Sequence, residues 1–463
     1  MNETIFRKYD IRGLADSDLT DEVVTHIGRA YARKIGASEG TRKVVAVGYD
    51  ARGSSERLYS ALSRGLRQGG ASVIKLGMVP TPLVYFANFT DERADGAIQI
   101  TGSHNPAEYN GFKMMIGKDT LHGEGIQQLK HIILEQDFED VAPEVTEEIV
   151  REDLKQTYSS WMMEHVRRDG RPLKVVLDSG NGVAGVIAPE VIREVFSGEV
   201  FELFSEPDAA FPNHHPDPTV EENLTHLIDE VRAQGADLGV AYDGDGDRIG
   251  VVDERGEVIW GDKLMILLSR NVLAENPGAT IIGEVKCSQT LFDDITRHGG
   301  EAIMSAVGHS LIKARIKETG AKLAGEMSGH IFFNDRFFGF DDAIYATCRV
   351  MEILSATPAG TTLSSLLEDV PQTYATPELR VECDEALKFE LPGEVAAHFA
   401  AKGLEVNTID GARVHFEHGW GLVRASNTQP VLVMRVEATS PELRDTYLAS
   451  LNAALASAQA DRT

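Results

Sequence analysis

The sequence predicts an α/β protein with three similar mixed-sheet α/β domains and a C-terminal α+β domain. The chain has 463 residues, which corresponds to roughly three domains of ordinary size. Short runs of β-branched residues alternate with helical patterns through most of the sequence, as in parallel α/β units. Near the end this alternation stops, and strand patterns follow one another without helices between them.

The first α/β unit shows the pattern most clearly. Residues 43–49 (KVVAVGY) form an uninterrupted apolar run, which is typical of a strand buried on both faces. We expect a helix next, with Ser54 or Ser55 as its N-cap and leucines spaced four apart on one face. The glycine pair at 69–70 ends this helix, because glycine adopts the left-handed conformation after a helix. Residues 72–79 are the next predicted strand.

The same alternation recurs twice before the C-terminal region. The second unit predicts strands at 173–177 and 237–242 and a helix at 188–196. The third predicts strands at 279–285 and 302–306 and helices at 291–298 and 310–319. At the end, residues 414–416, 422–425 and 431–438 predict an antiparallel meander closed by a helix rich in Ala and Leu. The expected domains are therefore residues 1–150, 151–255, 256–368 and 369–463.

Composition and charge argue against several classes of function. The formal net charge is −27, so the surface repels nucleic-acid backbones and anionic lipids, and we expect neither as a partner. Cys287, Cys348 and Cys383 are too few and too far apart for a disulfide framework or a CxxC metal site. The N-terminus lacks the apolar core of a signal peptide, and no apolar run reaches the ~18 residues that span a bilayer. We expect a cytoplasmic protein.

The most informative segment is the acidic loop DGDGDR at residues 243–248, directly after an apolar strand pattern. The glycines allow a tight turn that brings the carboxylates of Asp243, Asp245 and Asp247 onto one face. Three carboxylates this close repel one another unless a cation lies among them, and oxygen ligands favour Mg²⁺ or Ca²⁺. The loop therefore predicts a divalent metal site.

Two other interpretations of this loop compete. In an EF-hand, Glu254 would be the twelfth loop residue, but Arg248 stands where that loop requires glycine. The flanking segments also resemble strands rather than helices. The other alternative is a solvated acidic turn, and three carboxylates in register after a buried strand favour the metal loop over it.

A second loop, TGSHNP at residues 101–106, follows another strand pattern and contains a possible nucleophile, Ser103. Serine in a Gly-Ser turn is usually structural. His104 does not complete a catalytic triad, because adjacent side chains diverge. The nearby segment YNGFK at 109–113 ends in Lys113, which could reach back to neutralise a phosphate or exchange a proton.

Two further loops carry polar side chains. Residues 325–330 (GEMSGH) include Glu326 and Ser328, an acceptor and a donor suited to sugar hydroxyls, while His330 is as readily a core residue as a catalyst. Residues 424–430 (RASNTQP) combine an arginine, two hydroxyls and an amide in a turn. This set suits a phosphate dianion, although a polar hairpin turn is a strong competing interpretation.

The four loops together indicate one chemistry. Ligands of open α/β sheets bind beyond the carboxyl ends of the strands, where three of these loops are expected. The loops supply a hydroxyl nucleophile, a divalent metal site, sugar-binding groups and a phosphate-binding turn. This combination predicts phosphoryl transfer involving a phosphorylated, hydroxyl-rich substrate.

At these motifs the sequence resembles the α-D-phosphohexomutase family, and within it the bacterial phosphomannomutase/phosphoglucomutase group. The resemblance covers essentially the whole chain, because the motifs occur in the family's order: YDIRG at 9–13, TGSHNP, YNGFK, DGDGDR, GHS at 308–310, GEMSGH and RASNTQP. It implies a heart-shaped fold in which four domains surround a central cleft.

The resemblance also implies an activity. Ser103 would be phosphorylated in the resting enzyme, and its phosphate would bind Mg²⁺ together with Asp243, Asp245 and Asp247. The phosphoserine would donate its group to a mannose or glucose 1- or 6-phosphate. The resulting hexose 1,6-bisphosphate, which also serves as activator, would turn over and return its other phosphate to the serine. We expect hexose phosphates as ligands and a monomeric enzyme.

Further site residues are assigned by the resemblance alone. Arg12 and Lys113 match residues near the phosphoserine, with Lys113 a candidate general base, and His330 matches a proton-transfer partner. The residues that match substrate contacts are Tyr9, Arg248, Lys286, His309, Glu326, Ser328, His330, Arg424, Ser426, Asn427 and Thr428.

Alternative functions make different predictions. Met327 resembles the mannose/glucose group, whereas phosphoglucosamine mutases typically have glutamine at this position. A Mg²⁺-dependent sugar phosphatase would release inorganic phosphate, and a Ca²⁺-binding module would show no turnover. The mutase mechanism also requires cations to converge on one site against the overall negative charge, and the candidates are Arg12, Lys113, Arg248, Lys286 and Arg424.

Overall fold

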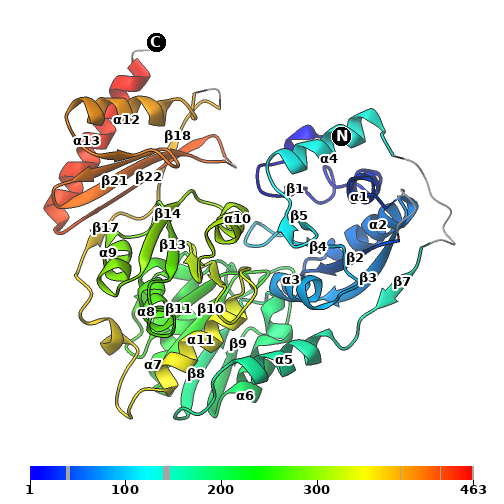
Figure 1. Cartoon of the computed structure of the whole chain (residues 1–463), viewed down its shortest axis with the longest axis horizontal. Coiled ribbons are helices and arrows are strands. Elements are labelled where there is room, and N and C mark those ends of the chain that lie inside the picture. The colour runs from blue at the N-terminus through cyan, green and yellow to red at the C-terminus, as the bar shows by residue number, and fades with distance from the viewer. Residues whose placement is uncertain (38–41, 139–145, 386, 428, 461–463) are drawn as a thin grey trace.

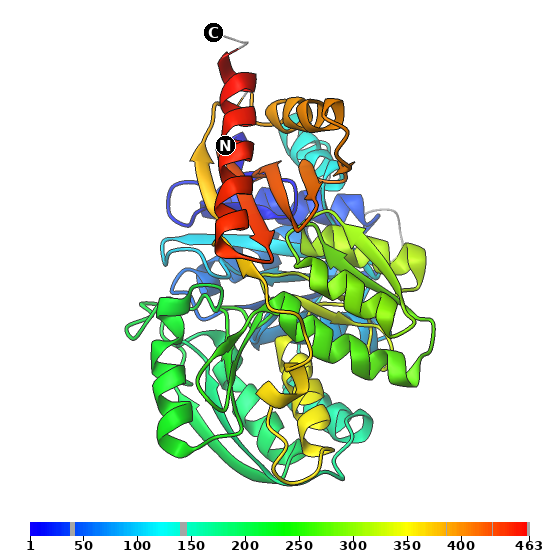
Figure 2. The same ribbon diagram turned by 90° about the vertical axis from the view of Figure 1, so that its left-hand side faces the viewer.

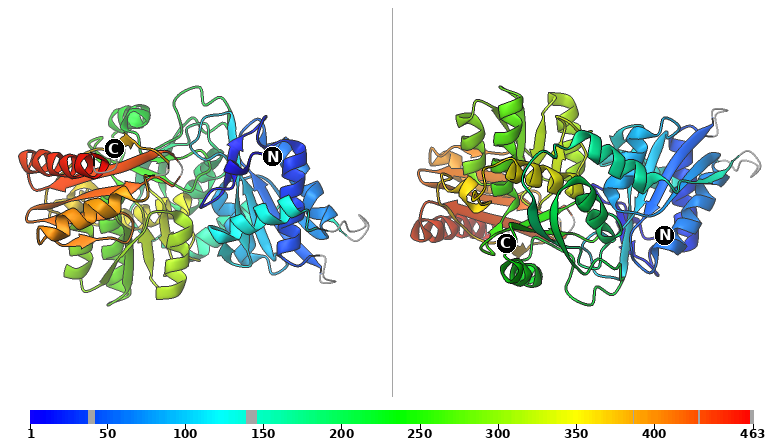
Figure 3. Two further views of the ribbon diagram at one scale, coloured as in Figure 1. Left: turned by 90° about the horizontal axis from the view of Figure 1, so that it is seen from above. Right: turned by 90° about the horizontal axis from the view of Figure 1, so that it is seen from below.

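The structure, a computed structural model, describes residues 1–37, 42–138, 146–385, 387–427 and 429–460. The chain forms four β-sheets in sequence order, and Figure 1 shows them arranged in an arc. The first and last sheets lie at the two ends of this arc, so the N-terminal and C-terminal domains face each other across it (Figures 1 and 3). The predicted fold class, three α/β domains followed by an α+β domain, is confirmed.

The first domain contains a mixed sheet. Its elements are η1 (Glu3–Ile5), β1 (Ile11–Leu14), α1 (Asp21–Lys34), β2 (Lys43–Tyr49), α2 (Ser55–Gln68), β3 (Ala71–Met78), α3 (Thr81–Thr90), β4 (Gly96–Ile100), β5 (Tyr109–Ile116), β6 (Asp119–Thr120), α4 (Glu124–Glu135) and β7 (Glu148–Val150). The strand order is β1-β5-β4-β2-β3-β7, with β6 beside β5. β2 pairs in parallel with β3 and β4, whereas β5 runs antiparallel to β1 and β4.

The continuous apolar run of β2 is explained by burial on both faces. Val45 and Val47 pack into the core beneath α1 and α2, while Val44 and Ala46 point to the opposite core, which includes α3. A strand covered by helices on both sides has no solvent face, so it needs no polar alternation. Ser54 occupies the N-cap position of α2 as predicted, but its side chain makes no capping bond there.

The second domain contains a five-stranded sheet in the order β12-β11-β10-β8-β9. Its elements are α5 (Leu154–His165), β8 (Leu173–Asp178), η3 (Val183–Val186), α6 (Ala188–Val195), β9 (Gly198–Leu203), η4 (Glu221–Leu224), α7 (Thr225–Gln234), β10 (Leu238–Tyr242), β11 (Ile249–Asp253) and β12 (Val258–Ile259). β10 is parallel to β8 and antiparallel to β11, so the acidic loop is the turn of the β10–β11 hairpin.

The third domain contains a four-stranded mixed sheet in the order β14-β13-β15-β16. Its elements are α8 (Gly261–Glu275), β13 (Thr280–Glu284), α9 (Gln289–Arg297), β14 (Glu301–Ser305), α10 (His309–Thr319), β15 (Leu323–Gly325), β16 (Ile331–Phe333), α11 (Ala343–Ser355) and η5 (Ser364–Leu367). The predicted strands and helices of this unit are present, with shifts of one or two residues at their ends.

The fourth domain has an antiparallel sheet. Its elements are β17 (Tyr374–Ala375), β18 (Leu379–Glu382), α12 (Leu391–Ala401), β19 (Val406–Asn407), β20 (Ala412–Phe416), β21 (Gly419–Ala425), β22 (Val431–Ala438) and α13 (Pro441–Ala460). The predicted meander is β20-β21-β22, and the predicted closing helix is α13, which crosses the sheet at the top of Figure 2.

The cores of the domains are not equally separate. One hydrophobic cluster joins α3 of the first domain to buried strands and helices of the second and third domains, whereas the fourth domain has a core of its own. Among the described helices, none is both long and apolar enough to cross a membrane. The domain boundaries near 150, 255 and 368 stay a prediction.

A buried carboxyl at the start of α11 gives the fold a pH dependence that can be tested. Asp342 is 1% exposed and accepts hydrogen bonds from the Tyr345 N–H at 2.9 Å and the Tyr158 hydroxyl at 2.8 Å. Burial raises the pKa of this carboxyl to about 7. The folded chain therefore keeps a proton that the unfolded chain releases near pH ~4, so this group makes the fold less stable as pH rises from about 4 to about 7.

We expect Asp342→Asn to be more stable than the parent at about pH 8, by roughly 1–4 kcal/mol, and close to it at about pH 5. Asparagine keeps an acceptor for the Tyr345 N–H and a polar partner for Tyr158 while it removes the buried charge. Urea unfolding of both proteins at the two pH values measures the difference. An effect of equal size at both pH values would show that the charge is not its cause.

Candidate active site

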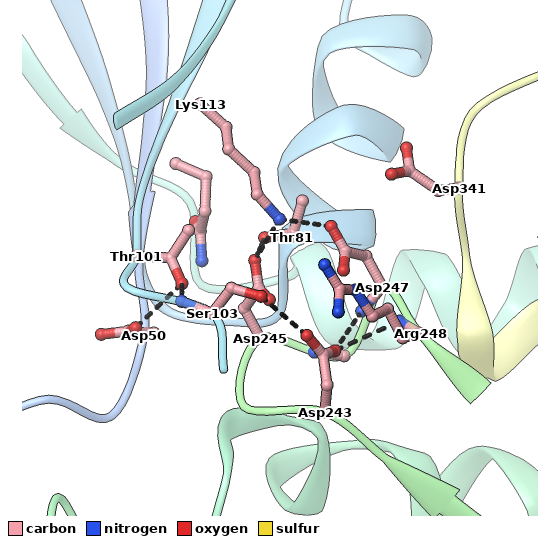
Figure 4. Close-up of polar contacts among 12 residues, drawn as sticks. Asp50, Thr81, Thr101, Ser103, Lys113, Asp243, Asp245, Asp247, Arg248 and Asp341 are labelled. Atoms are coloured by element: carbon pink, nitrogen blue, oxygen red, sulfur yellow. Dashed lines mark hydrogen bonds and ion pairs between the residues drawn. The ribbon is translucent and has the colours of Figure 1, made fainter. Parts of the chain in front are cut away.

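Ser103 lies in a strained turn directly after β4. Its φ angle is +49°, a left-handed conformation that residues other than glycine seldom adopt. The residue is 2% exposed, and its hydroxyl donates a hydrogen bond of 2.8 Å to Asp243 Oδ2 (Figure 4). A Cβ on Gly244 would lie 2.4 Å from the Ser103 carbonyl oxygen, so only glycine allows the two turns to approach this closely.

The acidic turn is fully buried. Asp243, Asp245 and Asp247 are each 0% exposed, and one carboxylate oxygen from each lies within 4.8 Å of the others. Asp243 Oδ1 accepts hydrogen bonds from the backbone N–H groups of residues 246, 247 and 248, which shapes the turn around it. Burial and the two neighbouring carboxylates raise the pKa of Asp243. This cluster could hold a metal ion.

Two oxygens of the cluster, Asp245 Oδ1 and Asp247 Oδ1, lack a hydrogen-bond partner among the described residues, although Asp247 Oδ1 lies 3.2 Å from His330 Nε2. Asp245 Oδ1 is buried without one, while Asp245 Oδ2 accepts from Thr81 Oγ1 and from Lys113 Nζ, the latter at 2.7 Å. A buried anionic oxygen without a donor is costly, and a cation would relieve this cost. All the available ligand atoms are carboxylate oxygens, which suits a hard divalent ion such as Mg²⁺.

Lys113 reaches the acidic turn from β5 and is almost completely buried. Its ammonium contacts both Asp245 and Asp247 (Figure 4). Burial alone would lower the pKa of Lys113, but the two carboxylates raise it above its ordinary value. The same lysine holds the pKa values of Asp245 and Asp247 below the ordinary range, although burial opposes this. Lys113 is therefore a cation in this arrangement and offsets part of the negative charge of the acidic turn.

The GEMSGH loop joins β15 to β16 and lies beside the acidic turn. Backbone pairing between Arg248 and His330 connects the two loops. His330 Nδ1 lies 2.8 Å from Glu326 Oε2, and its Nε2 lies 3.2 Å from Asp247 Oδ1. Burial would lower the pKa of His330, but the carboxylates of Asp247 and Glu326 raise it to about 9. The imidazole is therefore positively charged at neutral pH.

His309 begins α10, and its ring stacks on His330 with a centroid separation of 5.6 Å. Lys313 Nζ lies 3.2 Å from His309 Nδ1 and donates to Asp341 Oδ1 at 2.8 Å. Burial lowers the pKa of His309 well below its ordinary range, and Lys313 lowers it further, so this imidazole is neutral. Two adjacent histidines of the site thus carry different charges.

The C-terminal loop contacts the N-terminal segment of the chain. The Asn427 side-chain amide donates to the Tyr9 hydroxyl, which in turn donates to the Val307 carbonyl at 2.9 Å. Arg424 Nε donates to Asp410 Oδ2 at 3.0 Å. These contacts join segments of the first, third and fourth domains. Thr428, which the resemblance assigns to phosphate binding, lies outside the described residues.

The remaining predicted residues lie around these loops. Arg12, on β1, forms an ion pair with Asp10. Lys286 Nζ lies 3.2 Å from Glu378 Oε2; burial would lower its pKa, but Glu284 and Glu378 raise it. The Ser426 N–H donates to the Val431 carbonyl across the β21–β22 turn. Ser328 Oγ lies 3.4 Å from His330 Nδ1.

Several of the predicted cations act electrostatically on titratable groups of the site. Burial lowers the pKa of His104, and Arg248, Arg12 and Lys113 lower it further, so all three charges lie near the serine turn. Arg424 influences the pKa of Lys286 in the same way, and Glu326 faces both Lys286 and Arg248. These cations lie among several carboxylates, so an excess of positive charge at the site stays a prediction.

Several residues of the site escaped prediction from the sequence. Thr81, Lys313 and Asp341 lie in segments without an unusual motif. Asp50 and Arg52 contact the serine turn, and a signal for them was present: they directly follow the buried strand at 43–49, at the kind of strand end where the other site loops were found. The EF-hand alternative is not supported, because Glu254 hydrogen-bonds Ser364 instead.

Comparison with known proteins gives consistent matches along the chain. Models of the phosphoglucomutase/phosphomannomutase family match residues 3–140 (alpha/beta/alpha domain I), 152–256 (domain II), 260–374 (domain III) and 378–454 (C-terminal domain). The chain is 46% identical to phosphoglucomutase of Neisseria gonorrhoeae, over 94% of this chain and 93% of that protein.

Two further relatives are similar over comparable lengths. Phosphomannomutase/phosphoglucomutase of Pseudomonas syringae pv. tomato is 46% identical, over 95% of this chain and 93% of that protein. Among solved structures, a phosphoglucomutase/phosphomannomutase family protein from Burkholderia thailandensis superposes with a TM-score of 0.92 at 41% identity, covering 99% of this chain and 98% of the other.

Proposed function

Because this chain belongs to the phosphoglucomutase/phosphomannomutase family and is an isomerase of that activity, we propose that it moves the phosphoryl group between C1 and C6 of hexose phosphates through Ser103. The observation that supports this route is the 2.8 Å hydrogen bond from Ser103 Oγ to Asp243 Oδ2. This bond places the Ser103 hydroxyl directly against a buried cluster of three carboxylates.

We propose Mg²⁺ as the ion of this cluster. Asp243, Asp245 and Asp247 would hold it, together with a phosphate oxygen on Ser103, and the unpartnered Asp245 Oδ1 supports this fit. When bound, the ion would supply positive charge that stabilises the transferring phosphoryl group. A hexose 1,6-bisphosphate is the proposed activator, because it can phosphorylate a serine that has lost its phosphate.

The chemistry at the serine is a displacement at phosphorus. In the first half-reaction a hydroxyl of the bound hexose phosphate attacks, the bond from phosphorus to Ser103 Oγ breaks, and a hexose 1,6-bisphosphate forms. In the second, Ser103 Oγ attacks the other phosphate and the isomeric hexose phosphate is left. We propose Lys113 and His330 as the residues that transfer the hydroxyl proton; both are cations in this structure, so the one that accepts this proton must first release its own. We propose Arg12 as a cation beside the phosphoserine.

The remaining residues would bind the sugar and its non-transferring phosphate. Glu326 and Ser328 offer an acceptor and a donor to the sugar hydroxyls. The end of β21 offers Arg424 to the phosphate, and the turn after it offers backbone N–H groups. The proposed substrate-binding residues are Tyr9, Arg248, Lys286, His309, Glu326, Ser328, His330, Arg424, Ser426, Asn427 and Thr428. We further propose a monomer in the cytoplasm, where its three free cysteines would stay reduced.

An assay of the products tests this proposal. With Mg²⁺ and a trace of glucose 1,6-bisphosphate, the enzyme should convert glucose 1-phosphate and mannose 1-phosphate to their 6-phosphates, and the two values of kcat/KM give the sugar preference. Total sugar phosphate should be conserved. Release of inorganic phosphate in step with substrate loss would instead indicate a phosphatase, and turnover confined to glucosamine phosphates would indicate a phosphoglucosamine mutase.

A further inference from the structure

The side chain of Arg52 hydrogen-bonds the backbone of the turn that carries Ser103. Arg52 lies in the segment between β2 and α2. Arg52 Nη2 donates to the carbonyl oxygens of Ser103 at 2.7 Å and Asn105 at 2.6 Å. Its Nη1 donates to the carbonyl oxygens of Pro106 at 2.5 Å and Tyr109 at 3.0 Å. Its Nε donates to Asp50 Oδ2 at 3.2 Å.

These contacts use the whole donor capacity of the guanidinium. An arginine side chain has five N–H groups in a fixed plane, and here each of them has an acceptor. The side chain is 1% exposed, so water does not compete for these bonds. A lysine could not replace it, because an ammonium has three donors at one point and cannot reach acceptors distributed around a plane.

Asp50 connects this arginine to the start of the same turn. Its Oδ2 accepts from the Thr101 hydroxyl at 2.9 Å (Figure 4). The same oxygen accepts from the Gly102 N–H at 3.1 Å. Its Oδ1 accepts from the Arg52 N–H at 3.0 Å. A Cβ on Gly102 would lie 2.4 Å from the Arg52 guanidinium carbon, so the glycine of the motif leaves space for the arginine.

Two residues of the second domain also contact the serine turn and Arg52. His215 Nε2 hydrogen-bonds the carbonyl oxygen of His104, and the Phe211 ring lies 5.6 Å from the Arg52 guanidinium. The four successive carbonyl groups of residues 103 to 106 therefore all bond to side chains, three of them to Arg52. The left-handed Ser103 lies within this segment, and such a conformation persists only where its surroundings hold it.

We propose that Arg52 is a positioning residue for the nucleophile. It holds the Ser103 turn in the conformation that directs Oγ at Asp243, and Asp50 orients Arg52 for this task. Among the described residues, the Arg52 side chain donates hydrogen bonds to backbone oxygens and to Asp50, so it acts on phosphoryl transfer through Ser103 and not on sugar binding. The inference rests on the proposed function, because it assumes that Ser103 carries the phosphate.

The test measures transfer to serine separately from binding. We expect Arg52→Lys to lower kcat by about 100-fold, since a displacement of about 1 Å has this effect on a reacting group. KM for glucose 1-phosphate should stay within about threefold, because the residues that bind the sugar are unchanged. The rate at which dephosphorylated protein gains one phosphate from glucose 1,6-bisphosphate, followed by intact mass, should fall as kcat does.

Two further variants separate positioning from general stability. Asp50→Asn keeps the guanidinium but removes the negative charge beside it and replaces one of the two acceptor oxygens with a donor, so it should lower the same rate while KM stays unchanged. Arg349→Lys is the matched control: Arg349 is also fully buried and bonds Asp335 at 2.9 Å and Asn271 at 3.0 Å, away from the serine turn. It should lower the melting temperature without slowing phosphorylation of Ser103.

The results distinguish the inference from the function on which it rests. If the parent gains no phosphate at Ser103, the proposed function is overturned, and this inference with it. If the parent is phosphorylated and Arg52→Lys and Asp50→Asn react at the parent's rate, only the inference is overturned. The same holds if Arg349→Lys slows the reaction as much as Arg52→Lys, because the loss would then follow stability rather than position.

Discussion

The Ser103→Ala variant is expected to lose turnover almost completely, with kcat reduced by roughly 10⁴-fold or more, the scale on which removal of a covalent nucleophile acts. The variant lacks the oxygen that accepts and donates the phosphoryl group, which in this structure is 2.8 Å from Asp243 Oδ2. Intact-mass measurement after incubation with glucose 1,6-bisphosphate should show one added phosphate on the parent and none on the variant.

Binding should survive this substitution. The dissociation constant for glucose 1-phosphate, measured by calorimetry, should stay within about threefold of that of the dephosphorylated parent, because the sugar contacts are made by other residues. Ser103→Thr should not restore turnover, since a β-branched residue is strained at a φ of +49°.

The matched control for the serine is Ser63→Ala. Ser63 is also buried in the first domain, where its hydroxyl donates to Glu148 Oε2 at 2.6 Å. This variant should keep kcat and the exchangeable phosphate. Turnover by Ser103→Ala at a rate near that of the parent would assign the chemistry to another residue and contradict the proposed route.

The second large effect is expected from the acidic turn. Asp245→Asn should lower kcat by about 10³-fold, since charge neutralisation at the transferring group is the main source of catalysis in phosphoryl transfer. The substitution also removes one of the two carboxylates that bind Lys113. Its direct readout is thermal stability, because Mg²⁺ at 100 times its dissociation constant should stabilise the parent by about 2.7 kcal/mol and the variant far less.

Thermal melting with added EDTA or Mg²⁺ measures this difference without any substrate. Asp253→Asn is the matched control, because Asp253 is also a buried aspartate of the second domain, where it accepts from the backbone N–H groups of Arg255 and Glu257 at 2.9 Å. This control should keep the parent's response to Mg²⁺. An undiminished response in Asp245→Asn would put the ion elsewhere in the protein.

Much of the fold was predictable because its signals are local. The strand predicted at 43–49 is β2, the strand predicted at 431–438 is β22, and the helix predicted at 310–319 is α10 within one residue. Continuous apolar runs and helical spacing reflect which faces of an element are buried, and this information is written in neighbouring residues. The order in which strands pair and their directions depend on segments distant in the sequence. The alternation of strands and helices was the only sequence signal for them.

The Ser103 turn shows where local rules are not enough. In a Gly-Ser turn, glycine is the residue expected to take the left-handed conformation. Here Ser103 takes it instead, while Gly102 makes room for the Arg52 guanidinium. The conformation of the nucleophile is therefore set by Arg52, a residue 51 positions away in the sequence.

By itself, the sequence determined the inventory of the site: a serine turn, three aspartates separated by glycines, sugar-binding and phosphate-binding loops, and the cations. Only the tertiary structure decided the state of these groups. Lys113 is held as a cation by carboxylates 132 and 134 positions away, and His330 and His309 carry different charges although they stack. The physical reason is that desolvation and Coulomb interaction depend on distances between domains, which spacing along the chain does not contain.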